Sequence, residues 1–332
     1  MDSGIKQFRV DPIEILLASN NSVIEYFTER DLLDKNVEPI KTLWELPEVQ
    51  KILKKQLPNG SWNYPGKKVN SYPKHHYPLL QTWKEFRILV ERYELNKKQP
   101  NAKAAAEFLF SCQTKDGDIR GMIGNQYATY YTGAIMAALI KAGYTNDPRI
   151  ERGFKWLLSM RQEDGAWTIP ILTHRFDRET QLRLTSGKAK PVEPDRTKPF
   201  SHNWTDMVLR AFAAHPKYCR SKVAKHAGEL LKSRFFQPDV YTSYKAPEYW
   251  VRFAFWWPNL LTSLESLSQL GFSYKDNDIN MALDWFIENQ QKDGLWKISY
   301  KKDEKDKVNE KTRQDMMWIT LRICRVFKGF LK

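Results

Sequence analysis

Four segments of this chain repeat one pattern, in which an apolar, helix-like run is followed by a polar residue and a glycine turn at fixed offsets. The glycines are Gly60, Gly117, Gly165 and Gly294, and two residues after each stands Trp62, Ile119, Trp167 or Trp296. Four residues before each glycine stands Gln56, Gln113, Arg161 or Gln290. A pattern that recurs at fixed offsets is typical of a repeat protein, in which each unit packs on its neighbours.

Each copy predicts a helix that ends at the glycine turn and is covered by the residue that follows. In the third copy Phe154, Leu157 and Leu158 fall at i, i+3 and i+4, which gives the helix one apolar stripe. Asn-Gly or Asp-Gly then ends the helix, because glycine accepts the positive φ of a helix stop. The side chain at the glutamine position is expected to bond carbonyls that the helix end leaves open.

A fifth copy lacks the motif residues and is located only by its position relative to the other copies. When its leucine pair is aligned with that of the third copy, Arg234 takes the glutamine position, Pro238 the glycine position and Val240 the aromatic position. The motif is eroded there, but a helix followed by a stop is still predicted.

A second helix is expected between successive copies, at residues 76–95, 126–142, 202–214, 252–270 and 313–330. Several of these are apolar on more than one side, which is typical of buried helices, whereas the helices of the repeated copies carry charged residues between apolar ones. The predicted fold class is therefore all-α, with about five to six pairs of inner and outer helices. The repeat alone does not distinguish an open solenoid from a closed ring.

The repeat resembles the QW motif, Gln-x-x-x-Gly-x-Trp, of the squalene–hopene and oxidosqualene cyclases, and the looser repeat of the protein prenyltransferase β subunits. Residues 56–62 and 290–296 fit the motif fully, whereas the third copy departs at Arg161 and the second at Ile119. The resemblance implies an α/α toroid, which is a closed barrel of helix pairs, and an isoprenoid or related lipid as ligand. It is specific for the fold and weak for the reaction, because one fold hosts unrelated activities.

Length and composition agree with a single domain over residues 1–332. The chain is 42% hydrophobic, enough for a large core, and a repeat architecture keeps this length in one body. Residues 1–47 are expected to form an N-terminal helical extension. Residues 168–200 are expected to be a long loop insertion, which is either a lid or membrane-facing loop, or else a disordered or simply decorative segment.

The net charge indicates which partners the protein can bind, and the cysteines indicate its cellular location. A net charge of +14 suits nucleic acid, anionic lipid or a phosphorylated substrate. The basic residues are spread over the whole chain, so we expect no nucleic acid partner. We expect an isoprenoid or other lipid, with peripheral contact to an anionic membrane as a further option. The chain shows no signal peptide or spanning segment, and its odd set of cysteines is typical of reduced thiols, so a cytoplasmic protein is predicted.

Aromatic residues gather near the N-terminal ends of the expected inner helices. In a closed barrel these ends would converge on one cavity, where each ring could stabilise a carbocation by about 0.5 to 2 kcal/mol. Ordinary core packing explains the same pattern equally well. Trp256 and Trp257 stand out, because adjacent residues do not face the same side of a helix. The candidate substrate-binding residues are His76, Tyr127, Tyr130, Tyr131, Trp204, Trp256, Trp257 and Trp318.

There are fewer catalytic candidates. The Asp-x-Asp-Asp motif that starts the reaction of squalene–hopene-type cyclases is missing from the sequence. The metal-binding Asp-Asp-x-x-Asp motif of ionisation-type terpene synthases is missing as well. The nearest string, 276–278, precedes an outer helix and is expected to be its N-cap. His202, Asp206 and Arg210 recur on one helix face. They predict either a His202–Asp206 acid/base pair or an Asp206–Arg210 ion pair near the surface. Asp315, at the start of the last inner helix, is a further candidate.

No metal and no cofactor are expected. His215, Cys219 and His226 are close in sequence, but Pro216 separates the first from the helix that holds the others. Two function classes follow. The first is an enzyme of the cyclase or prenyl-transfer type that acts on an isoprenoid or other lipid in a central aromatic cavity. The second is a non-catalytic lipid- or protein-binding toroid that has lost the enzymatic residues.

Overall fold

The computed structural model describes residues 7–241, 246–253, 256–302 and 309–330. Within these residues all regular structure is helical, and the extended pairs are isolated bridges such as that of Gln56 with Trp62. The all-α prediction is confirmed. Contacts divide the chain into a central unit, Pro39–Ala227, and a terminal unit, Met1–Glu38 with Gly228–Lys332. The single domain and the closed ring stay predictions. None of the described helices has the length and apolarity needed to cross a bilayer.

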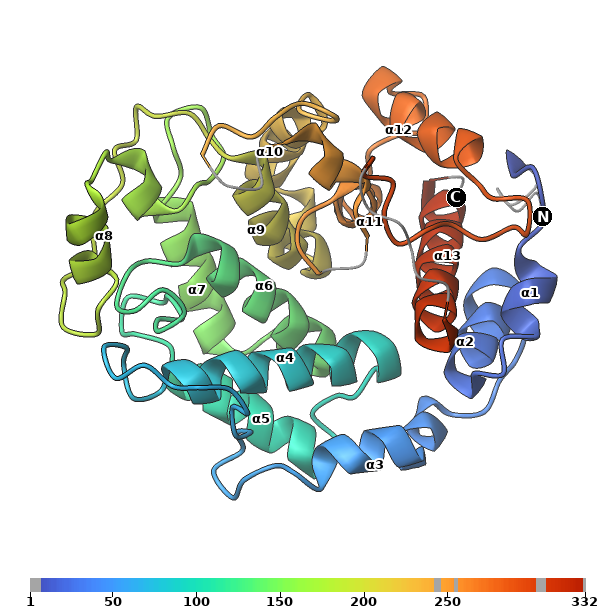
Figure 1. Ribbon diagram of the computed structural model, residues 1–332, viewed down its shortest axis with the longest axis horizontal. Helices are drawn as coiled ribbons and strands as arrows, with labels where there is room; N and C mark the ends of the chain where they lie inside the picture. Colours follow the sequence, from blue (N-terminus) through green and yellow to red (C-terminus); the bar gives the residue numbers. More distant parts are fainter. Residues whose placement is uncertain (1–6, 242–245, 254–255, 303–308, 331–332) are drawn as a thin grey trace. The chain divides into compact units, whose positions relative to one another are not determined.

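The central unit alternates outer and inner helices, as predicted. The outer helices are α3 (Pro47–Leu53), α5 (Pro100–Ser111) and α7 (Pro148–Ser159), and the inner helices are α4 (His76–Tyr93), α6 (Thr129–Leu139) and α9 (His202–Ala214). Shorter helical turns are η3 (Ile40–Glu45), η4 (Ile140–Tyr144) and η6 (Tyr218–Arg220). Every residue of α6 is buried, whereas α7 buries one face. In Figure 1, α6 lies between α4 and α9, and it contacts both.

The closest helix pair of the central unit is α6 with α9. Gly133 of α6 makes this approach possible, because a Cβ atom there would lie 2.6 Å from the Cα atom of Val208 in α9. The two backbones are therefore in contact, and the residues at their N-terminal ends are fixed relative to one another.

The terminal unit is formed from both ends of the described chain. Its elements are α1 (Ile13–Leu17), α2 (Ser22–Phe27), η2 (Thr28–Leu32), η7 (Pro247–Val251), α11 (Leu260–Gln269), α12 (Asn277–Glu288) and α13 (Glu310–Phe330). The boundary between the units falls within α10 (Lys222–Lys232). α13 packs on α11 and on the N-terminal elements α2 and η2 (Figure 1).

The predicted role of the glutamine position is confirmed in every copy. Its side chain donates to the carbonyl at the glycine position, with donor–acceptor distances of 3.0 Å for Gln56–Gly60, 2.9 Å for Gln113–Gly117, 3.0 Å for Arg161–Gly165 and 3.0 Å for Gln290–Gly294. In the eroded fifth copy Arg234 makes the same bond to Pro238, at 2.9 Å. The copy found by phase is therefore confirmed, although Val240 at its aromatic position is exposed.

The three motif tryptophans occupy equivalent places. The indole Nε1 of Trp62, Trp167 and Trp296 donates to the carbonyl ten residues earlier, at 2.9, 2.7 and 2.8 Å. The backbone N–H at the aromatic position donates to a threonine hydroxyl of the next inner helix, which is Thr82, Thr132, Thr205 or Thr320. Each turn is thus bonded to its own outer helix and to the inner helix that follows.

The motif glycines serve two purposes at once. Gly60 has a φ of +84°, and a Cβ atom there would lie 2.1 Å from the carbonyl oxygen of Ala104 in α5. Gly117 has a φ of +114°, and its Cβ atom would lie 2.4 Å from the Arg152 oxygen in α7. Each turn therefore needs a left-handed residue and also presses directly on the next outer helix.

In the first two copies the motif glutamine bonds a carbonyl of the next outer helix. In the last copy it bonds a carbonyl of the N-terminal segment instead. Gln56 and Gln113 bond the carbonyls of Asn101 in α5 and Arg149 in α7, and Gln290 bonds the carbonyl of Val10 at 2.7 Å. Val10 N–H donates back to Gln290 Oε1 at 3.0 Å. Within the described residues, α1 and α2 therefore follow α12 and α13 in the repeat, whereas the N-terminal extension over 1–47 stays a prediction.

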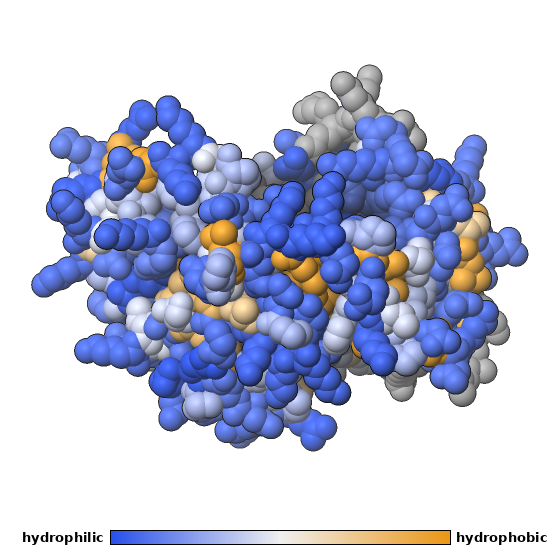
Figure 2. Space-filling view, turned by 90° about the horizontal axis from the view of Figure 1, so that it is seen from below, coloured by the Kyte–Doolittle hydropathy of each residue, from blue (hydrophilic) through white to orange (hydrophobic). Residues whose placement is uncertain are grey.

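The surface agrees with an outer layer of charged helices. The face drawn in Figure 2 is mainly hydrophilic, with small and separate hydrophobic areas. Few large apolar side chains are strongly exposed among the described residues, and one of them is Leu182 in the insertion, at 66%.

Candidate functional site

Three aromatic rings meet at the N-terminal ends of α6 and α9 in the central unit. The ring centroid of Tyr130 lies 4.4 Å from that of Tyr131 and 4.5 Å from that of Trp204. All three side chains are buried. Ser201 caps α9 by accepting from the Trp204 N–H, which fixes the first turn of the helix. The structure therefore brings these three candidates into one cluster, called here the three-ring cluster.

Asp206 lies one turn further along α9 and is fully buried. Its Oδ2 accepts from Nη2 of Arg210 at 2.6 Å and from Nε at 3.1 Å. The ion pair expected from the sequence is present, but its predicted place near the surface is wrong, because the Asp206 side chain is completely buried. His202 is buried in the first turn of the same helix, and its pairing with Asp206 stays a prediction.

The inner helix α4 adds a second arginine to this part of the central unit. Arg87 donates to Glu91 at 3.1 Å. Burial lowers the pKa of Arg87, while Glu91 raises it and the positive charge of Arg210 lowers it further. The inner helices α4 and α9 thus hold two arginines within electrostatic reach, each beside a carboxylate.

His76 and Tyr127 lie in the loops that lead into the inner helices. Nδ1 of His76 is 2.5 Å from the Gly121 oxygen, and burial lowers the pKa of this imidazole. The Tyr127 hydroxyl donates to Glu193 of the insertion at 2.9 Å, and burial together with this carboxylate raises the pKa of Tyr127 to about 12. In the described residues neither ring contacts the three-ring cluster. These two substrate-binding assignments stay predictions.

The insertion 168–200 is held by two buried amides. Gln126 Nε2 donates to the oxygens of Leu184 and Lys190, at 2.7 and 3.0 Å. Gln162 Nε2 donates to the oxygens of Asp195 and Lys198, at 2.8 and 2.9 Å. The insertion contains η5 (Pro170–Thr173) and α8 (Arg178–Leu184), and α8 buries none of its side chains. A glutamine side chain that organises a distant loop leaves no periodic signal, so the sequence did not reveal this role.

The insertion contacts the loops that lead into two inner helices. Gly187 N–H donates to the Ser71 oxygen before α4 at 2.7 Å, and Asn125 N–H before α6 donates to the Ser186 oxygen at 3.3 Å. The insertion is therefore bonded to the loops just before α4 and α6. Its function as a lid stays a prediction.

In the terminal unit, Trp256 and Trp257 lie before the start of α11 and not within a helix as predicted. The helix predicted over 252–270 begins only at Leu260, where Asn259 and Thr262 form a capping box. The two indoles stack on each other, with centroids 5.0 Å apart and planes at 15°. The prediction that they face different sides was wrong, because Pro258 disfavours helix at the residue before it.

The remaining candidates lie in α13. Trp318 is buried and packs edge-on against Phe27 of α2, with ring centroids 6.4 Å apart. Asp315, three residues earlier, is partly exposed. The common mouth expected for His202 and the two stacked tryptophans would span both units, so it stays a prediction.

The histidines considered as metal ligands bond backbone carbonyls instead. Nε2 of His215 lies 3.2 Å from the Thr145 oxygen, and Nε2 of His226 lies 2.8 Å from the Asp164 oxygen. Among the described residues no cluster of three or more His, Cys, Asp or Glu could hold a metal ion. The cysteines are free thiols, and burial raises the pKa of Cys112 to about 12.

Comparison with known families supports the resemblance. Residues 85–181 match the family of the squalene-hopene cyclase C-terminal domain. This range runs from within α4 to α8 and includes the second and third copies of the repeat together with Tyr130 and Tyr131. A comparison with curated protein sequences found no match.

Several solved structures are similar to this chain at low sequence identity. A protein from Actinoplanes is 14% identical with a TM-score of 0.46, and the match covers 93% of this chain and 90% of that one. The type II terpene cyclase MstE from Scytonema is 14% identical with a TM-score of 0.43, covering 95% and 98%. A protein described as a novel alpha-amylase from Clostridium perfringens is 13% identical with a TM-score of 0.44, covering 85% and 78%. Similarities this low leave the reaction open.

Proposed function

We propose that this protein binds an isoprenoid or another lipid against the aromatic side chains at the N-terminal ends of its inner helices. The observation that carries the proposal is the three-ring cluster, in which the ring centroid of Tyr130 lies 4.4 Å from that of Tyr131 and 4.5 Å from that of Trp204. Aromatic walls give a lipid chain a large apolar contact and an allylic or cationic centre a π face. The match to the squalene-hopene cyclase family over 85–181 supports the same ligand class.

We further propose that binding does not lead to protonation-initiated cyclisation of the squalene–hopene type. The Asp-x-Asp-Asp string is missing from the sequence. The buried carboxylate nearest in sequence to the three-ring cluster, Asp206, forms an ion pair with Arg210, and an acid catalyst needs a proton to give. This observation favours the non-catalytic lipid-binding protein over an enzyme that uses another acid.

A binding experiment tests the first part. Delipidated protein is titrated with squalene and with geranylgeraniol in detergent micelles, and binding is followed by retention on a sizing column. Trp204→Leu is expected to weaken binding by about 1 to 3 kcal/mol through lost apolar contact. Trp62→Leu in the first copy of the repeat is the control, because Trp62 is buried to a similar extent but bonds the Ile52 carbonyl of α3, outside the three-ring cluster. Equal losses in both variants would reject the site.

A product analysis tests the second part. The protein is incubated with squalene and with oxidosqualene, and the extracts are analysed by gas chromatography with mass spectrometry. We expect no polycyclic triterpene. Formation of a polycyclic triterpene would show that an acid of this protein starts the reaction and that the non-catalytic reading is wrong.

Contact with an anionic membrane is a separate part of the proposal. It rests on the net charge of +14 and on Leu182, which is exposed beside the basic residues of the insertion. Sedimentation with vesicles of phosphatidylserine and phosphatidylcholine should exceed sedimentation with phosphatidylcholine alone, and Leu182→Asp should reduce it. Equal sedimentation with both vesicles would argue against membrane contact.

A further inference from the structure

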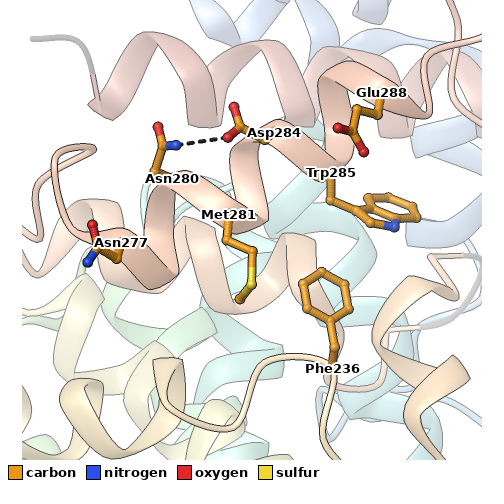
Figure 3. A pocket seen from close by; sticks show the side chains of 7 residues that line it. All are labelled: Phe236, Asn277, Asn280, Met281, Asp284, Trp285 and Glu288. Atoms are coloured by element: carbon orange, nitrogen blue, oxygen red, sulfur yellow. Dashed lines mark hydrogen bonds between the residues drawn. The ribbon is translucent and has the colours of Figure 1, made fainter.

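A pocket of about 460 Å³ lies on the outer side of the terminal unit, apart from the inner helices. Its lining residues are Phe236, Asn277, Asn280, Met281, Asp284, Trp285 and Glu288. All but the first come from α12, at spacings of three and four residues, so they share one face of that helix. The volume falls in the range of small-molecule sites. Figure 3 shows these side chains along α12, with Phe236 opposite Trp285.

Two aromatic side chains form the walls of the pocket. Phe236 has a φ of +60°, an unfavourable left-handed conformation for a residue with a Cβ atom. In this conformation its ring centroid lies 6.3 Å from that of Trp285. The indole is held from another side by the edges of Tyr300, at 5.0 Å, and Phe253, at 6.0 Å. Both wall residues remain partly exposed, so part of each side chain is accessible to a ligand.

The charges of the pocket are all negative. α12 carries three acidic residues and no lysine or arginine, although the chain has a net charge of +14 and the outer helices α7 and α10 are basic. Asp278 is paired with Lys232. Asp284 accepts one hydrogen bond from Asn280, at 2.8 Å (Figure 3). Within the described residues no ion pair neutralises Asp284 or Glu288.

We propose that this pocket binds a small organic cation of the alkylammonium or guanidinium class. The cationic head would be attracted by Asp284 and Glu288 and would lie against the π face of Trp285. The apolar part of the ligand would contact Met281, whose side chain is 45% exposed. A phosphate or carboxylate ligand is disfavoured, because it would meet two like charges. This inference does not depend on the proposed lipid site.

Choline and 3,3-dimethylbutan-1-ol form a matched pair of probes, since they have nearly the same shape and differ in charge. Agmatine serves as the guanidinium probe. Binding is followed by NMR of protein labelled with ¹³C at the methionine methyl groups, where eight signals are expected. Met281→Leu identifies the signal of the pocket. We expect choline or agmatine to shift this signal and the neutral alcohol to leave it in place.

Variants test the contribution of each wall. Asp284→Asn with Glu288→Gln keeps the shape of the pocket and should weaken cation binding by at least about tenfold. Trp285→Leu should weaken it as well, with circular dichroism confirming that the helices persist. Asp116→Asn removes an exposed acidic residue from another turn and should have no effect.

Three outcomes would overturn the inference. One is a Met281 shift of equal size with the neutral alcohol, which would mark a plain apolar pocket. Another is an equal loss of affinity in Asp116→Asn, which would mark general electrostatic attraction. The third is the lack of any shift with both cations. A shift confined to the cations and lost in the Asp284 and Glu288 variant supports it.

Discussion

Replacement of Asp206 by Asn should destabilise the central unit strongly. The substitution keeps the size of the side chain but removes the negative charge that pairs with the guanidinium of Arg210, which is only 15% exposed. Two unit charges about 4 Å apart attract by about 4 kcal/mol at an effective dielectric constant of about 20. Removal of one member of a buried pair costs about 3 to 5 kcal/mol, which is the same range. An exposed pair would cost about 0.3 to 0.5 kcal/mol.

The assay is urea unfolding of the wild type, Asp206→Asn, Arg210→Met and the double variant. We expect each single variant to lose about 3 to 5 kcal/mol, corresponding to a melting temperature lower by roughly 6 to 20 °C for a unit of this size. The double variant should recover much of the loss, because no charge is then left alone. Single losses below about 1 kcal/mol, or losses that simply add in the double variant, would refute the argument from burial.

Three further predictions follow from the turns and from a buried imidazole. Gln290→Ala should cost about 1 to 3 kcal/mol in urea unfolding, because it removes three hydrogen bonds at a residue that is 7% exposed. Gly60→Ala should lower the free energy of unfolding by at least about 2 kcal/mol more than Gly143→Ala. Both glycines have a positive φ, but the atom nearest to the new Cβ lies at 2.1 Å for Gly60 and at 3.5 Å for Gly143. Equal losses would show that φ alone matters. Burial lowers the pKa of His76 from 6.5, so below that pH the unfolded chain binds a proton that the folded state refuses. Stability should be complete above about pH 6.5 and fall as the pH drops through the folded pKa, and His76→Gln should reduce this slope in unfolding curves.

The repeated part of the fold follows from the sequence because its causes are local. The glutamine, the glycine and the tryptophan of each copy lie within seven residues, so spacing alone reveals the hydrogen bonds that Gln56 and Trp62 make. Even the eroded copy at Arg234 can be found, because its leucine pair keeps the phase of the third copy, and in the structure its guanidinium takes the place of the glutamine amide. The threonine that accepts from each turn lies on the next helix, at a variable distance along the chain, and no spacing rule points to it.

The candidate site is predicted less well, because its geometry depends on contacts between distant segments. Tyr130 and Trp204 meet because α6 and α9 cross at Gly133, which a single sequence does not disclose. The α12 pocket was missed because Phe236 enters it through an unusual backbone conformation outside any regular element.

The bond between Val10 and Gln290 has a consequence for biosynthesis. These residues are 280 positions apart, whereas every contact within the central unit joins residues of one continuous stretch. At about 5 to 20 residues per second, the N-terminal segment waits roughly 14 to 56 s for its partner to leave the ribosome. During that interval Phe8, which in the native structure packs against Trp296 and Phe327, has no native neighbour from the C-terminal segment. We therefore expect the central unit to fold first during translation, and a chaperone that captures the nascent chain to do so at the N-terminal segment.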